Sequence, residues 1–183
     1  YREDKENPGR MYVGVHAQGT STKYALAQVM GVLLQKAHGI SPPQVQDNFH
    51  TLTVYFNSLR ELGGALVLSY DDVPRYMKAI SSMEDTKIRP LPQIQELTSQ
   101  LPDSMIPEVL DGLDTPIIDL QKSLDDEPYD IVLASNMISV GVDVDRLGLM
   151  VVNGQPKTTA EYIQASSRIG RPRDSAGLVV TMY

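Results

Sequence analysis

Two arginines near the end of the chain could hold one anion together. Arg168 and Arg171 are three residues apart, a spacing that puts both guanidinium groups on one side of a helix end. A guanidinium stays charged and bonds two oxygens at once, which suits a transferring phosphoryl group. Gln164, one turn before Arg168, could hydrogen-bond the same phosphate or its attacking water. The other interpretation is an arginine pair that complements the dipole at a helix C-terminus.

Further polar residues that could meet a nucleotide follow the apolar run 130–134. Ser135 and Asn136 leave this run, and a hydroxyl, amide or N–H there can meet a phosphate without adding charge. Gly141 permits close backbone approach, while Asp143 offers a carboxylate to a ribose hydroxyl or an arginine. Both groups of residues also suit ordinary turns and helix caps, so each alone is a weak indication of a site.

Short apolar, β-branched runs alternate with amphipathic stretches along the chain. The runs predict strands at 11–17, 51–57, 93–98, 130–134, 147–152 and 177–182. The stretches between them predict five helices. The first covers 25–37 and is capped by Thr20 or Ser21, the second begins at the capping box 58–61, and a short third follows Asp71 and Asp72 through residue 80. The fourth is capped by Asp103 or Ser104, and the fifth begins at the capping box 158–161 and ends near Gly170.

This alternation predicts an α/β fold with a covered, mainly parallel sheet and right-handed crossovers. In open sheets of this kind, ligands bind beyond the carboxyl ends of the strands. We therefore expect the site in the loops after Ala134 and Val152 and on the helix from Thr159. Residues 1–10 are charged and predict a linker, residues 11–183 the domain, and residues 81–92 a surface insertion.

The arrangement resembles the second RecA-like domain of superfamily 2 helicases and translocases. Residues 131–144 (IVLASNMISVGVDV) look like that family's motif V, and residues 164–171 (QASSRIGR) look like its motif VI, usually Q-x-x-G-R-x-G-R. Residues 54–61 (VYFNSLRE) are more weakly similar to motif IV. The residue sequence of motif V and the long 81–92 region are also similar to those of bacterial phage-defence helicases.

The resemblance implies a RecA-like three-layer sandwich and a role for each motif residue. Arg168 and Arg171 would be arginine fingers on the γ-phosphate of ATP, with Gln164 supporting them. Gly141 and Asp143 would line the nucleotide edge of the cleft.

The resemblance also implies contacts with nucleic acid. Ser135, Asn136, Asn57 and Ser58 would lie along its backbone. Two residues depart from the family pattern: Asn136 stands where many members have Asp, and Ser167 stands where most have Gly. Neither change removes an arginine, although Ser167 could crowd the approach of the phosphate.

The 183 residues contain no G-x-x-x-x-G-K-[ST] phosphate loop and no D-E-x-x box for Mg²⁺. We therefore expect ATP and Mg²⁺ to be held mainly by an N-terminal RecA-like domain of the same protein, and this chain alone to be inactive. The absence of an N-terminal Met also suggests a piece of a longer protein. The track could be DNA or RNA.

Composition limits the other possibilities. With no cysteine and three scattered histidines, the chain shows no metal-ligand spacing, and no apolar run is long enough to span a bilayer, so we expect a cytoplasmic protein without a membrane partner. A net charge of −7 argues against broad binding to nucleic acid and favours the alternative of a noncatalytic RecA-like interaction module. A Rossmann-type enzyme ranks last, because no G-x-G-x-x-G follows the first strand.

Overall fold

The computed structural model describes residues 7–90, 92–117, 128–135, 143–172 and 174–183, and the strands within these ranges form one parallel sheet. The elements in chain order are β1 (Arg10–Val15), α1 (Thr22–His38), α2 (Pro43–His50), β2 (Leu52–Phe56), α3 (Leu59–Glu84), β3 (Ile94–Leu97), the 3₁₀ turn η1 (Asp103–Met105), α4 (Ile106–Asp114), β4 (Ile131–Ser135), β5 (Leu149–Asn153), α5 (Thr159–Ser166) and β6 (Gly177–Met182).

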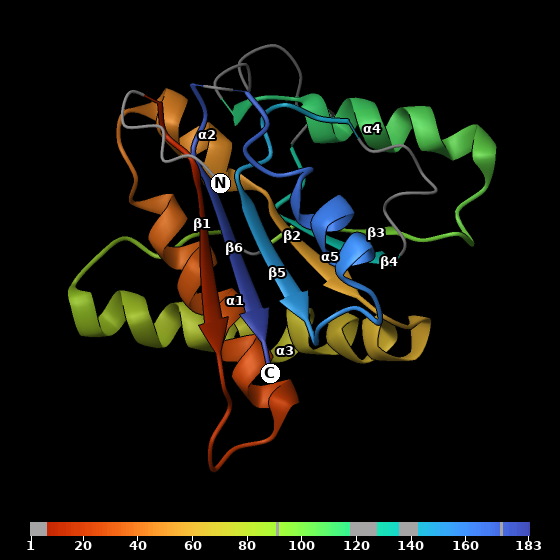
Figure 1. Cartoon of the computed structure of the whole chain (residues 1–183). Coiled ribbons are helices and arrows are strands. Elements are labelled where there is room, and N and C mark those ends of the chain that lie inside the picture. Colours follow the sequence, from red (N-terminus) through yellow and green to blue (C-terminus); the bar gives the residue numbers. More distant parts are fainter. Residues whose placement is uncertain (1–6, 91, 118–127, 136–142, 173) are drawn as a thin grey trace.

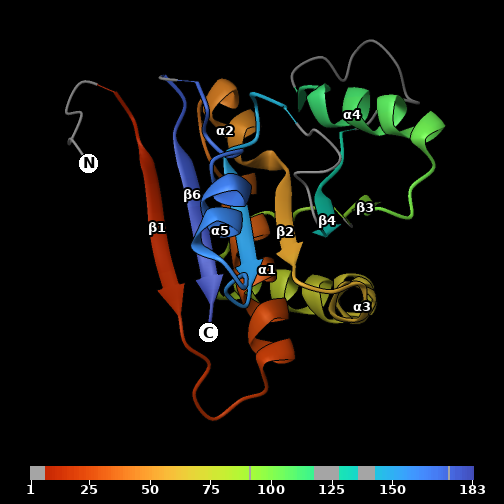
Figure 2. The same cartoon turned by 45° about the vertical axis from the view of Figure 1, so that its right-hand side comes forward.

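The sheet has the strand order β1-β6-β5-β2-β4-β3 and lies between two layers of helices (Figures 1 and 2). Helices α1 and α3 bury their apolar residues against one face, around Met30, Leu34 and Met77. Helices α4 and α5 cover the other face, where Val109 and Ile169 join a second core cluster. The predicted three-layer α/β sandwich is confirmed. No helix in the described ranges is both long and apolar enough to cross a bilayer.

Three hydroxyl caps begin the helices where the sequence predicts them. Ser21 accepts a hydrogen bond from Tyr24 N at 3.4 Å and begins α1. Ser58 likewise begins α3, and Thr158 begins α5. Each cap satisfies an N–H that has no partner inside its own helix, so each helix starts at a defined residue directly after a strand or loop.

The structure differs from the predicted helices in three places. Helix α4 begins at Ile106 after the 3₁₀ turn η1, so neither Asp103 nor Ser104 caps it.

Helix α3 runs without a break from Leu59 to Glu84, so Asp71 and Asp72 lie inside it instead of beginning a new one. It continues past Pro74 because its buried face, from Leu62 to Ser81, outweighs the one backbone hydrogen bond that proline removes.

Helix α2 is a further difference, because no helix is predicted over these residues from the sequence. Pro43 is the first residue of α2, where the missing N–H needs no partner.

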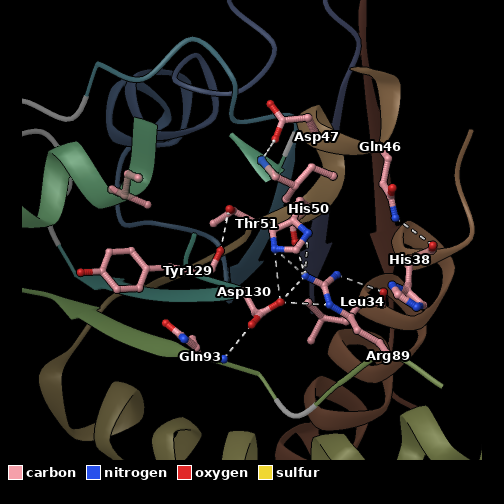
Figure 3. Close-up of polar contacts among 12 residues, drawn as sticks. Leu34, His38, Gln46, Asp47, His50, Thr51, Arg89, Gln93, Tyr129 and Asp130 are labelled. Atoms are coloured by element: carbon pink, nitrogen blue, oxygen red, sulfur yellow. Dashed lines mark hydrogen bonds and ion pairs between the residues drawn. The ribbon is translucent and has the colours of Figure 1, made fainter. Parts of the chain in front are cut away.

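Residues 81–92 do not form a separate surface insertion. The first four belong to α3, and Arg89 is buried, with its side chain 2% exposed. Its guanidinium donates to the Asp130 carboxylate, to the His50 carbonyl at 2.9 Å and to the Leu34 carbonyl at 3.2 Å (Figure 3). Because these acceptors satisfy a buried charge, Arg89 ties α1 to the amino ends of β2 and β4.

A second buried arginine holds the amino end of β5. Arg146 donates to the Leu113 carbonyl at 2.7 Å, to Thr51 Oγ1 at 3.1 Å and to Asp47 Oδ1 at 3.3 Å. These partners come from α4, from the residue before β2 and from α2. Arg146 therefore fixes the chain three residues after Asp143, one of the predicted site residues.

His50 makes this amino edge sensitive to acid. Burial, followed by the charges of Arg89, Arg146 and His38, lowers the pKa of His50 from 6.5 to about 3, although Asp130 Oδ1 lies 3.4 Å from its ring. The unfolded chain binds a proton below about pH 6.5 that the folded protein does not bind. Folding is therefore weakened as the pH falls from about 6.5 toward about 3, and is unaffected by this group above that window.

We predict that His50→Gln flattens the loss of stability in acid. Urea unfolding between about pH 7.5 and about pH 4.5 should show the wild-type chain losing up to about 1.4 kcal/mol per pH unit more than the variant, because one proton is linked to unfolding. The exposed His16 provides the control, and His16→Gln should follow the wild-type curve. Parallel curves for wild type and His50→Gln would contradict the prediction.

Candidate functional site

The structure divides the predicted site residues between the two edges of the sheet. Asn57, Ser58 and Ser135 lie at the carboxyl ends of β2 and β4, where the sequence predicts a site. Arg168 and Arg171 lie at the opposite edge, which is formed by the amino ends of the strands. The expectation that these arginines lie at the carboxyl ends is therefore wrong. Helix α5 leaves the carboxyl end of β5 and returns along the sheet, and the loop after it must therefore lie at the amino ends (Figure 1).

The two arginines follow α5 instead of lying on its last turn. The helix ends at Ser166, and Ser167 N donates to the Ile163 carbonyl at 2.9 Å to close it. After the helix, the chain forms a nonhelical turn from Ser167 to Gly170. Gln164 is exposed on α5, Arg168 is half-buried in the turn, and Arg171 is exposed just beyond it. The helical spacing argument therefore fails, and the turn decides where the guanidinium groups lie.

This turn, residues 167–170, is held by close backbone packing. Gly170 has a φ of +56°, and its N–H donates to the Leu147 carbonyl at 2.7 Å. A Cβ at this position would lie 2.8 Å from the backbone of Gly177, so only glycine fits. Ile169, fully buried beside it, anchors the turn in the core. Packing alone therefore requires a glycine at position 170 of the motif, whatever the motif binds.

Arg171 and Asp143 form an ion pair at the amino edge. Their side chains are 36% and 60% exposed, and with Asp145 and Pro172 they line an open cleft of about 340 Å³. An exposed pair of this kind contributes little to stability, so a stronger anion can replace the carboxylate. Gly141 and Asn136 lie outside the described residues. Among those described, no three His, Cys, Asp or Glu side chains could hold a metal ion together.

The carboxyl edge brings the other predicted contacts side by side. Ser135 pairs in register with Phe56, so it is next to Asn57 and Ser58 across the β2–β4 ladder. Ser135 is 8% exposed, which leaves its hydroxyl only a narrow access to a ligand. Asn57 Nδ2 donates to the Gly154 carbonyl at 3.1 Å. Asn57 and Ser58 therefore also have structural functions, as a loop tie and a helix cap.

A cleft beside these residues was not predicted from the sequence. It has a volume of about 330 Å³, lies between the N-termini of α1 and α3, and is lined by Lys23, Glu61 and the loop after β5. Asn153, at the end of β5, lines it and has a buried Oδ1 with no hydrogen-bond partner among the described residues. Only the position of Lys23, two residues after the helix cap Ser21, could have indicated this cleft from the sequence.

Tyr55 attaches α5 to the sheet. Its hydroxyl donates to Glu161 Oε1 at 2.7 Å, and burial followed by this hydrogen bond raises the pKa of Tyr55. The tyrosine therefore stays a neutral donor. Because Glu161 lies in the first turn of α5, the contact fixes the start of the helix that leads to the 167–170 turn.

Comparison with known proteins identifies the domain. Residues 109–173, which include both the Asp143 segment and the arginine turn, match the family described as "Helicase conserved C-terminal domain". The chain is also 46% identical over 183 residues to the DISARM protein DrmA of Bacillus paralicheniformis. Residues 109–173 therefore belong to a stretch that is similar to helicase C-terminal domains. The match to DrmA covers 97% of this chain and 16% of the length of DrmA.

Solved structures share the fold of this helicase C-terminal domain at low sequence identity. T. fusca Cas3 with ADP has a TM-score of 0.54 and 14% identity, covering 100% of this chain and 19% of that one. The M. smegmatis helicase Lhr, bound to ssDNA and AMP-PNP, has a TM-score of 0.50 and 13% identity, covering 98% of this chain and 20% of that one. These structures share the fold, and the match over residues 109–173 confirms the predicted resemblance to a helicase C-terminal domain.

We predict that Gly170→Ala destabilises the helicase C-terminal domain by about 2–4 kcal/mol, because a Cβ there collides with the Gly177 backbone and disfavours the positive φ. Urea unfolding of the purified chain measures the change. Gly63→Ala is the matched control: nothing lies within 4 Å of a Cβ at that helical position. That control should raise stability by up to about 1 kcal/mol. Equal stability of Gly170→Ala and wild type would show that the turn is not packed as described.

Proposed function

We propose that this helicase C-terminal domain is the second RecA-like domain of an ATP-dependent motor that moves along nucleic acid. The observation that carries the proposal is the exposed guanidinium of Arg171 in the amino-edge cleft, held there by a turn that glycine and a buried isoleucine keep rigid. Likeness to DrmA supports the expected relationship to phage-defence helicases, and the structures of Cas3 and Lhr were solved with nucleotides.

The amino edge is suited to a nucleotide held by another domain. Arg168 and Arg171 are the proposed arginine fingers, with Gln164 as their supporting residue. In a site shared by two domains, the fingers belong to the domain that does not hold the phosphates. An N-terminal RecA-like domain would supply the phosphate loop and the Mg²⁺ ligands, and ATP would bring the two domains together.

Asp143 would hold Arg171 in place until the nucleotide arrives. The γ-phosphate carries more negative charge than one carboxylate and can bind a guanidinium through two oxygens as a carboxylate does, so it can take over the contact. Arg171 would then stabilise charge that develops during phosphoryl transfer, which is the catalytic part of an arginine finger. Asp143 would be left to bind the nucleotide's ribose or the second arginine, and Gly141 would line the same cleft.

The carboxyl edge is suited to the nucleic-acid backbone, DNA or RNA. Ser135, Asn136, Asn57 and Ser58 are the proposed contacts, made by hydroxyls, amides and N–H groups that add no positive charge to a chain of net charge −7. The separation of the two edges supports a motor, because closing the domains on ATP at one edge would move the nucleic-acid contacts at the other.

A noncatalytic interaction module is the second candidate. The Arg171–Asp143 ion pair favours it, because a guanidinium that already has an acidic partner needs no nucleotide to satisfy it. The same experiment decides between the two candidates.

We predict that Arg171→Ala in the full-length protein lowers nucleic-acid-stimulated ATP turnover by about 10³-fold or more, the scale of a lost arginine finger. Steady-state hydrolysis measures the effect. Arg75→Ala, which removes an arginine 77% exposed on α3, is the matched control and should leave turnover unchanged. The 183-residue chain alone should show no hydrolysis. Full activity of Arg171→Ala would favour the noncatalytic module.

We predict that Ser135→Asp weakens nucleic-acid binding while ATP binding stays nearly intact, because the new carboxylate faces a phosphate at the carboxyl edge and leaves the other edge untouched. Titration of labelled single-stranded nucleic acid at fixed salt measures affinity. Ser135→Ala, which adds no charge, is the control and should bind more tightly than Ser135→Asp. Equal affinities for Ser135→Asp and wild type would exclude the contact.

A further inference from the structure

Arg10 connects the edge strand β1 to the 167–170 turn. Its Nη2 donates to the Ser167 carbonyl at 3.1 Å, and its Nε donates to the Ile169 carbonyl. The two acceptors belong to the peptide groups on either side of Arg168 and Ile169. One side chain, 157 residues away in the sequence, thus holds the backbone that flanks a proposed arginine finger.

Arg10 is itself held against the sheet. It is the first residue of β1 and pairs in register with Gly177 of β6. Its side chain crosses that glycine so closely that a Cβ at residue 177 would lie 3.2 Å from the Arg10 Cγ. Gly177 therefore leaves room for two neighbours at once, the Arg10 stem on one side and the Gly170 backbone on the other. Arg10 therefore has little freedom to move independently of the 167–170 turn.

The two carbonyls that Arg10 binds lie in the turn after α5, beyond the helix itself. A cation is favoured near a helix C-terminus. A single guanidinium that bonds two such carbonyls fixes both peptide planes, which a lysine ammonium does less well because it lacks the planar fork. The contact restricts the backbone dihedral angles at Arg168 and so the direction of its side chain.

We propose that Arg10 is a positioning residue for Arg168, through which the strand that enters the domain controls the arginine turn. This rests on the proposed function, since it matters for catalysis only if Arg168 meets a phosphate. Residue 10, which the sequence assigns to a linker, then belongs to the catalytic apparatus. A displacement of β1 moves the finger, so the segment before β1 is mechanically coupled to hydrolysis.

The test is a double-mutant cycle in the full-length protein. Arg10→Met keeps the aliphatic stem over Gly177 and removes the donors, and Arg10→Lys keeps the charge. Single-turnover and steady-state ATP hydrolysis are measured for these variants with and without Arg168→Ala, together with KM for ATP and the melting temperature. Arg75→Met, at an arginine 77% exposed on α3, is the matched control.

We expect Arg10→Met to lower kcat by about 10²-fold, the effect of moving a catalytic group by about 1 Å, with KM within about twofold. Arg10→Lys should recover part of the loss. On the Arg168→Ala background, Arg10→Met should cause little further loss, because residues that act as one unit are not additive.

Two results would overturn the inference while the proposed function stands. One is a normal kcat for Arg10→Met alongside a large loss for Arg168→Ala. The other is an equal fold-change in kcat from Arg10→Met with and without Arg168→Ala, which would mean a general effect on the domain. Should Arg168→Ala and Arg171→Ala both keep full turnover, the proposed function itself would fail, and the inference with it.

Discussion

Two buried guanidinium groups at the amino edge of the sheet are the constraint on which the rest of the structure depends. Arg89 and Arg146 are almost fully buried, and each must have its donors satisfied within the protein, because an unpaired charge in the interior is very costly. Their acceptors come from α1, α2, α4 and the residues that precede β2 and β4. Satisfying two charges therefore fixes how the helices meet the strands.

The same edge carries the arginine turn, which is built by a different interaction. Backbone packs against backbone where Gly170 meets Gly177, and no side chain can be inserted between them. Ile169 is buried on the inner side, while the exposed Arg171 points its charge to an open cleft. The rigid part of the turn is thus apolar or glycine, and the charged part is free to exchange one anion for another. Such a combination suits a group that must act at a defined place on a ligand from elsewhere.

The fold separates two kinds of contact that the linear sequence places close together. Ser135 and Asp143 are eight residues apart in the chain, yet one lies at the carboxyl end of β4 and the other near the amino end of β5. A parallel sheet makes this separation unavoidable, since the chain must cross the whole height of the sheet between one strand and the next along the sequence. In the proposed motor, this geometry would place nucleotide and nucleic acid at opposite edges of one rigid body.

The sequence by itself determined the α/β class, the strands and the helix starts at Ser21, Ser58 and Thr158, because periodicity and capping are local properties. It also determined the helicase resemblance, because motif residues keep their spacing. Tertiary structure alone decided which edge each motif occupies, since that depends on the return path of α5. It also decided that residues 81–92 contain a core arginine, and that Arg10 supports the turn beside Arg168. Polar residues that are buried through distant partners have no local pattern, and only the folded chain shows what satisfies them.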